Sequence, residues 1–326
     1  MMENNNAKYK VLWIDDQCED LKYFVLAADD QGIEITPKKY GKEGIEALRS
    51  NINAWDGVIL DVMCLYDEND RDLDPKKFYR ILGEIMANYD IPLFVYSAGQ
   101  GYNDGQDFRD VIAGFAELKL YHKNKDEDKL FEDIKQKAEG LLATRIRHKY
   151  LSFISDDRFQ EIEPTLIKIL TAVENNETNN ADVIMVCRQV LNKLMKYLEA
   201  VGILPLNFFK DTNLGDCSRF LGDDKLKEYV PIYIQRSLHS CVVVSNEGSH
   251  FCVVRNAITK GEAPFLIRST VFELLNILRW CATLSTDQEN VKKMRDDISS
   301  LNMKFKAKKD ENGNCPVGDH LVPDSQ

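Results

Sequence analysis

Long hydrophobic runs are absent from this chain. No apolar stretch among its 326 residues approaches the roughly 20 residues that a helix needs to cross a bilayer. The opening segment, MMENNNAKYK, lacks the apolar core of a secretion signal. We therefore expect a cytoplasmic protein that does not engage a membrane.

Paired cysteine motifs and an excess of basic charge are absent too. None of the eight cysteines forms a C-x-x-C, which excludes zinc knuckles and dithiol redox motifs, so we expect reduced and mostly buried thiols. The chain carries 42 basic and 53 acidic residues, a net charge of −11, and acidic residues are in excess both before and after residue 125. It thus lacks the positive field that drives nonspecific nucleic-acid binding, which argues against a DNA-binding protein.

The remaining composition is that of a globular protein, with 44% hydrophobic and 29% charged residues. Because one core rarely serves more than about 250 to 300 residues, a chain of this length favours two domains. We predict a first domain over residues 1–145, a second over 146–303, and a polar, flexible tail over 304–326.

The first domain alternates short apolar runs with amphipathic stretches. This alternation is typical of an α/β fold with a doubly wound, five-stranded parallel sheet of the flavodoxin-like kind. The predicted strands are 10–14, 33–36, 58–60, 92–96 and 118–121. The predicted helices are 19–29, 42–51, 76–88, 108–115 and one that starts at 126.

The second domain is predicted to be entirely helical. It is preceded by the helix that starts at 126, in which apolar residues recur at helical spacing from Leu130 to Leu142 and whose pattern continues towards Phe153. Further helices are predicted over 164–173, 182–201, 226–244, 265–284 and 288–302.

Polar residues stand where four of the predicted strands end. Asp15 and Asp16 follow KVLWI, Asp61 follows DGVIL, Ser97 follows IPLFVY and Lys123 follows AELKLYH. Open parallel sheets build their ligand sites at the carboxyl ends of their strands, so we expect these side chains to meet in one crevice. Three carboxylates, a hydroxyl and an ammonium can bind a divalent cation and accept a phosphoryl group. Asp61 is the natural nucleophile.

At these positions the chain resembles the receiver domain of two-component response regulators. The motifs that carry the resemblance are VLWIDDQ, DGVILDVM, IPLFVYSA and YHKN, and it covers about residues 7–140. It implies that Asp61 accepts a phosphoryl group from a histidine kinase, a phosphotransfer protein or a small acyl phosphate. It also implies that Asp15, Asp16 and Asp61 hold Mg²⁺ together with the backbone carbonyl of Met63.

The resemblance gives the other two polar residues catalytic roles. Lys123 would contact one phosphoryl oxygen as a point charge, and the Ser97 hydroxyl would hydrogen-bond another. The implied chemistry is limited to phosphorylation and dephosphorylation of the receiver itself, and no separate catalytic output is recognised.

The chain departs from the receiver pattern at three places. Asn124 replaces the proline that commonly follows the lysine, Leu120 occupies the aromatic switch position beside Tyr121, and the loop after Asp61 is long and acidic. In addition, Met63 provides a thioether where receivers orient the hydrolytic water, so slow loss of phosphate is expected. Met63 also stands where a haloacid-dehalogenase phosphatase needs its second aspartate, which argues against a hydrolase.

The helical half lacks a compact basic recognition helix, which argues against a winged-helix output. DVIMVCRQVLNKLMKYL, SNEGSH and FLIRSTVFELLNILRWC resemble HEPN-type helical domains through Arg188, Asn246, Gly248 and His250. No histidine has an arginine at the spacing of the HEPN ribonucleases. We therefore expect an output module that acts by protein or RNA contacts, and two alternatives stay open: a phospho-regulated enzyme with an RNase-like effector, and a degenerate receiver scaffold. A homodimer formed through residues 126–153 is also plausible.

Overall fold

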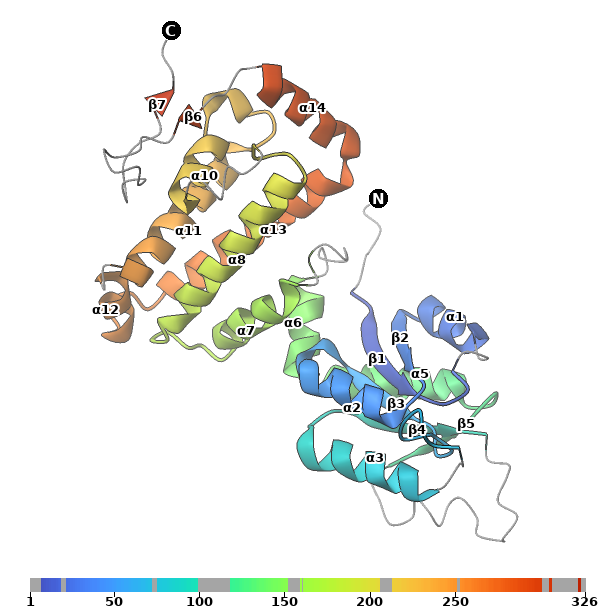
Figure 1. Ribbon diagram of the computed structural model, residues 1–326. Helices are drawn as coiled ribbons and strands as arrows, with labels where there is room; N and C mark the ends of the chain where they lie inside the picture. Colours follow the sequence, from blue (N-terminus) through green and yellow to red (C-terminus); the bar gives the residue numbers. More distant parts are fainter. Residues whose placement is uncertain are drawn as a thin grey trace. The chain divides into compact units, whose positions relative to one another are not determined.

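The chain folds into two compact units, residues 1–155 and 156–326 (Figure 1). The computed structural model describes residues 7–18, 22–71, 75–98, 118–151, 159, 161–205, 213–250, 253–300, 305–306 and 322–323. The predicted helix 108–115 and the glycine-rich loop ahead of it lie outside the described residues.

The first unit is built on a five-stranded parallel sheet, which confirms the predicted fold class. Its strands are β1 (Tyr9–Ile14), β2 (Ile33–Lys38), β3 (Gly57–Leu60), β4 (Leu93–Ser97) and β5 (Leu120–His122), in the order β2-β1-β3-β4-β5. The chain winds outward from β1 to β2 and then in the opposite direction from β3 to β5. Such a reversal opens a crevice at the carboxyl ends of β1 and β3, where ligands bind in sheets of this topology.

Helices cover both faces of this sheet (Figure 1). On one face α1 (Lys22–Asp30) and α5 (Glu127–Ala138) pack against the odd-numbered residues of β1, such as Trp13. On the other face α2 (Gly41–Ser50) and α3 (Pro75–Asn88) pack against the even-numbered ones, such as Ile14. Both faces of the central strands β1, β3 and β4 are therefore largely buried, which explains why these strands read as continuous apolar runs. A short 3₁₀ helix, η1 (Ile52–Ala54), leads into β3.

The helix predicted from 126 towards Phe153 is broken, contrary to expectation. α5 ends at Ala138, the chain turns at Glu139 and Gly140, and α6 (Leu142–Tyr150) begins a new helix. α6 packs on the first unit, where Thr144 and Arg147 both bond the buried carboxylate of Asp56. The boundary between the two units therefore lies at 155/156, ten residues beyond the predicted 145/146.

The second unit is helical, as predicted. Its elements are α7 (Glu163–Glu174), α8 (Asp182–Ala200), α10 (Leu214–Leu221), η3 (Asp224–Leu226), α11 (Ile232–His250), α12 (Val253–Thr259), α13 (Leu266–Thr286) and α14 (Gln288–Ser300). The three long helices α8, α11 and α13 contact one another and carry most of the core (Figure 1). Of the tail, the described residues Phe305–Lys306 (β6) and Val322–Pro323 (β7) pair as two antiparallel strands.

Two helices of this unit were not predicted, α10 and α12, and a third starts later than expected. The predicted helix 226–244 begins only at Ile232, because residues 224–226 form η3 and Pro231 then sets the first turn. The Pro231 carbonyl accepts hydrogen bonds from the amides of Ile234 and Gln235. A proline without an N–H fits such a helix start, where the first amides have no partner within the helix.

None of the described helices combines the length and the apolar character that a bilayer crossing requires. Six cysteines fall within the described residues, and all six are free and buried, as expected from the sequence. Cys252 and Cys315 lie outside the described residues.

Candidate functional site

Four of the predicted site residues are placed by the ladder of the parallel sheet. Asp15 directly follows β1, Asp61 follows β3, Ser97 ends β4 and Lys123 follows β5. Backbone hydrogen bonds continue the strand pairing through these positions: the Asp61 amide donates to the Ile14 carbonyl at 2.9 Å, and the Lys123 amide donates to the Ser97 carbonyl at 3.0 Å. The carboxyl ends of β1, β3, β4 and β5 thus bring the residues to one edge of the sheet, as the sequence predicts.

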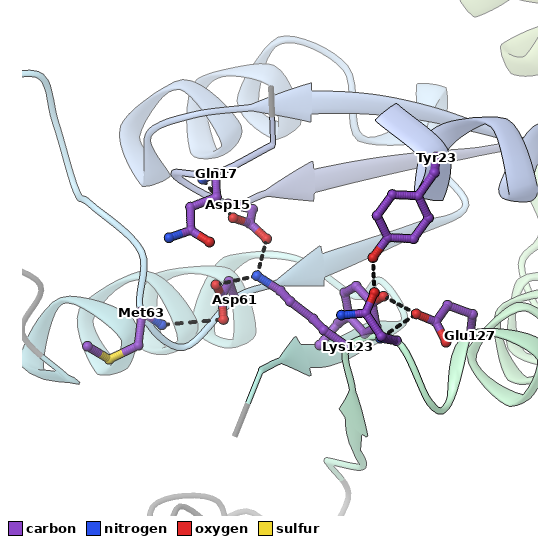
Figure 2. A network of polar contacts seen from close by, with 9 residues as sticks. Asp15, Gln17, Tyr23, Asp61, Met63, Lys123 and Glu127 are labelled. Atoms are coloured by element: carbon purple, nitrogen blue, oxygen red, sulfur yellow. Dashed lines mark hydrogen bonds and ion pairs between the residues drawn. The ribbon is translucent and has the colours of Figure 1, made fainter. Parts of the chain in front are cut away.

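The Lys123 ammonium lies between two carboxylates (Figure 2). Its Nζ is 2.7 Å from Oδ2 of Asp15 and 2.7 Å from Oδ2 of Asp61. The exposed fractions are 0% for Asp15, 4% for Asp61 and 8% for Lys123, so these charges have little access to water. Buried charges are tolerated when they are paired and hydrogen-bonded, and Asp15 gains a further bond of 2.8 Å from the amide of Gln17.

Three carboxylates stand close enough to share one cation. Asp15, Asp16 and Asp61 each offer an oxygen, and these oxygens lie within 4.8 Å of one another. Asp16 is half-buried at the mouth of the site. An all-oxygen, all-carboxylate donor set suits a hard ion such as Mg²⁺, so the residues present fit the predicted metal.

The pKa values of these groups reflect crowding of negative charge. Burial, and then the charge of Asp61, raises the pKa of Asp15 to about 6, although Lys123 opposes the shift. The same two causes raise the pKa of Asp16. Burial alone would lower the pKa of Lys123, but Asp61 and Asp15 together outweigh it and leave that pKa above its ordinary value. Three carboxylates face one ammonium, and a divalent cation would neutralise the excess.

Met63 and Ser97 complete the set of predicted residues. The Met63 amide is 3.5 Å from Oδ1 of Asp61, a long contact, and its thioether points away from Asp61 (Figure 2). Ser97 is 3% exposed and lies at the same edge as Lys123. The Met63 carbonyl as a metal ligand and the Ser97 hydroxyl as a hydrogen-bond donor to a phosphoryl oxygen stay predictions.

The acidic loop after Asp61 is folded onto neighbouring helices, which sequence reasoning missed. The amides of Gly41 and Lys42, at the start of α2, donate to the carbonyls of Leu65 and Tyr66 at 2.8 and 2.9 Å. Asp70 accepts from the Tyr66 amide at 2.8 Å and pairs with Lys77 of α3 at 3.1 Å. The segment that carries the candidate nucleophile is therefore tied to α2 and α3.

The structure also explains two departures from the receiver pattern. Tyr121 is buried against α1 and α5, and its hydroxyl donates to Asp133 at 2.5 Å, whereas Leu120 packs on the opposite face of the sheet. Asn124 has φ of 64°, which proline cannot adopt because its ring holds φ near −65°. The turn after Lys123 is thus built differently from one that contains proline.

Sequence reasoning missed Glu127, four residues after Lys123, and its partner Tyr96 on β4. Glu127, in the first turn of α5, accepts hydrogen bonds from the Tyr96 hydroxyl at 2.7 Å and from the Asn124 amide at 2.5 Å. The available signal was a carboxylate in the first turn of the helix that follows Lys123, where acidic side chains stabilise a helix by interacting with its dipole. It did not reveal the contact with Tyr96.

In the helical unit, two residues of the HEPN-type resemblance meet. Arg188 of α8 donates from Nη1 to Oδ1 of Asn246 on α11 at 2.7 Å. The SNEGSH segment forms the end of α11, beyond the predicted end of this helix at residue 244. The side chains of Gly248 and His250 lie outside the described residues.

No family model matches the chain, and no curated protein matches its sequence.

Proposed function

We propose that the first unit is a receiver-type domain that accepts a phosphoryl group on Asp61 in a Mg²⁺-dependent reaction. The observation that supports this most directly is the convergence of three carboxylates within 4.8 Å of one another, with the Lys123 ammonium 2.7 Å from two of them. This constellation lies at the carboxyl ends of β1, β3 and β5, where the sheet topology places ligands.

Each side chain has a defined task in the proposed reaction. An oxygen of the Asp61 carboxylate attacks the phosphorus and forms the new P–O bond, while the bond from phosphorus to the donor breaks and the donor group leaves with its electron pair. Lys123 transfers one of its contacts from Asp61 to a phosphoryl oxygen, and Ser97 donates to another. Asp15, Asp16 and Asp61, with the Met63 carbonyl, would hold Mg²⁺, which when bound offsets the charge on the transferred group.

The proposed partners follow from this chemistry. The phosphoryl donor would be a histidine kinase or phosphotransfer protein, and we propose that the protein meets this donor in the cytoplasm. The second unit is the output, acting through protein or RNA contacts. A pull-down that compares phosphorylated with unmodified protein would identify what the output binds.

Incubation with acetyl phosphate and Mg²⁺, followed by intact mass measurement, tests the proposal. The wild-type protein is expected to gain the mass of one phosphate, and Asp61→Asn, which keeps the size of the side chain, is expected to gain none. A wild-type protein that stays unmodified at high donor concentration would instead favour the degenerate scaffold.

The phosphorylated protein is expected to lose its phosphate slowly. The Met63 thioether is a poor hydrogen-bonding group and points away from Asp61, so it cannot orient an attacking water (Figure 2). Met63→Asn, which provides an amide, should shorten the lifetime of the phosphoprotein. Met86→Asn, at an exposed methionine of α3, is the matched control. A half-life of seconds for the purified wild-type phosphoprotein in Mg²⁺ would contradict the prediction.

RNA cleavage by the second unit is the alternative output. The observation that favours it is the bond between Arg188 and Asn246, two residues of the HEPN-type resemblance. Cleavage of single-stranded RNA by the phosphorylated protein, abolished in His250→Ala, would support this alternative. Equal cleavage by both proteins would point to a contaminating nuclease.

A further inference from the structure

The segment between β5 and α5 has to hold Lys123 with unusual accuracy. Four residues, 123–126, connect the last strand to the helix, and the first of them sends its ammonium to within 2.7 Å of two carboxylates. The Lys123 backbone is anchored on its N-terminal side by the bond to Ser97. What fixes the backbone on the C-terminal side decides where the long, flexible lysine side chain can reach.

The residue that follows Lys123 adopts a backbone conformation that needs outside support. Asn124 has a backbone φ of 64°, in the left-handed region that residues other than glycine rarely adopt. Such a conformation persists only where neighbouring groups hold it in place. Here the Tyr23 hydroxyl of α1 donates to the Asn124 side chain, and the Asn124 amide donates to Glu127 at 2.5 Å (Figure 2).

Glu127 joins this turn to the neighbouring strand. The same oxygen, Oε1, accepts from the Asn124 amide and, at 2.7 Å, from the Tyr96 hydroxyl. Tyr96 is 0% exposed and immediately precedes Ser97 on β4. One carboxylate therefore ties the residue after Lys123 to the residue before Ser97, the two groups expected to contact phosphoryl oxygens.

We propose that Glu127 is a positioning residue for the phosphoacceptor site: its carboxylate locks the left-handed turn at Asn124 against Tyr96 and so holds the Lys123 ammonium beside Asp61. This inference rests on the proposed function and adds to it a residue outside the predicted set. We call Glu127 and its two bonded partners, Asn124 and Tyr96, the clamp. The clamp lies where the receiver pattern has a proline after the lysine, so the Glu127 side chain would restrain the backbone as a proline ring otherwise does.

Glu127 bonds Asn124 and Tyr96, the chain neighbours of Lys123 and Ser97, and its described hydrogen bonds include none to the three carboxylates that would hold the metal. Its loss should therefore slow phosphoryl transfer without weakening Mg²⁺ binding, because an ammonium that leaves Asp15 and Asp61 competes less with the metal. A general loss of structure would lower both. This difference separates positioning from a merely structural role.

The test measures phosphorylation of the full-length protein by acetyl phosphate and, separately, Mg²⁺ binding by calorimetry. Glu127→Ala is expected to slow phosphorylation about 10- to 100-fold, the range in which small misplacements of a reacting group act. Glu127→Gln, whose amide oxygen still accepts from Asn124, should recover most of the rate. Glu132→Ala, at an exposed glutamate of the same helix, is the control and should match the wild type.

The outcomes distinguish this inference from the proposed function. A wild-type protein that takes up no phosphate overturns both. Wild-type phosphorylation with an equal rate in Glu127→Ala, or a parallel loss of Mg²⁺ affinity, overturns the positioning role alone. If Glu127→Ala does not fold, Tyr96→Phe decides, because it removes the Tyr96 hydroxyl that bonds Glu127. Slower phosphorylation without a loss of Mg²⁺ affinity supports the role, and a wild-type rate refutes it.

Discussion

Replacing Lys123 with methionine is expected to lower the free energy of unfolding of the metal-free N-terminal unit by about 3 to 5 kcal/mol. The substitution keeps an unbranched side chain of nearly the same length but removes an ammonium that bonds two buried carboxylates at 2.7 Å. Asp15, Asp16 and Asp61 would then repel one another with no cation between them. Mg²⁺ should restore more stability to the variant than it adds to the wild type, in which the metal competes with the ammonium for Asp15 and Asp61. At about 100 times its Kd a ligand adds about 2.7 kcal/mol.

Denaturant unfolding in EDTA and in excess Mg²⁺ measures both effects. Trp13 and Trp55 report on the first unit, so the series is best made in a Trp280→Phe background, which silences the second unit. Lys125→Met, at an exposed lysine two residues further on, is the matched control. The double variant Asp15→Asn/Lys123→Met removes one charge of each sign and should regain much of the lost stability. Equal stabilities of Lys123→Met and Lys125→Met in EDTA would show that the ammonium is not the counter-ion of this site.

The sheet and its site residues were accessible from the sequence because both depend on local patterns. Buried parallel strands appear as short apolar runs, and each polar residue at the carboxyl end of such a run reaches the same edge of the sheet. Asp15, Asp61, Ser97 and Lys123 needed no further information to be placed together. The strand order followed once the topology was known.

The features that the sequence did not reveal depend on contacts between distant residues or on turns without a periodic signal. Leu226 and Val230 continue the apolar spacing of α11 because both are buried. Leu226 nevertheless belongs to η3, and Val230 lies in the turn before Pro231. Glu127 and Tyr96 are 31 positions apart, and no local sequence pattern indicates that they are in contact. The position of α6 likewise depends on its bonds to Asp56, far back in the chain.

The contacts that Asp56 makes with α6 are the second feature whose loss is expected to have a large effect on stability. The Asp56 carboxylate, at 0% exposure, accepts from the Lys10 amide at 2.7 Å and bonds both Thr144 and Arg147 of α6. Arg147 is 2% exposed and also donates to the Asn53 carbonyl. Asp56→Ala would leave the Arg147 guanidinium buried without its carboxylate partner. We therefore expect a loss of about 3 to 5 kcal/mol in the free energy of unfolding of the first unit.

The size of this loss, followed by the fluorescence of Trp13 and Trp55, distinguishes a structural anchor from a surface ion pair. Exposed pairs contribute about 0 to 1 kcal/mol, so Lys8→Ala, which breaks the exposed contact with Asp29 at 2.5 Å, is the matched control. Asp56→Asn should fall between the two, because its amide oxygen can still accept from one donor while the charge is gone. Arg147→Met should destabilise the same unit, since it strips a buried carboxylate of its counter-ion. If Asp56→Ala and Arg147→Met instead left the stability of the first unit unchanged and destabilised only the second, α6 would belong to the second unit. The boundary between the units would then lie before α6 and not at 155/156.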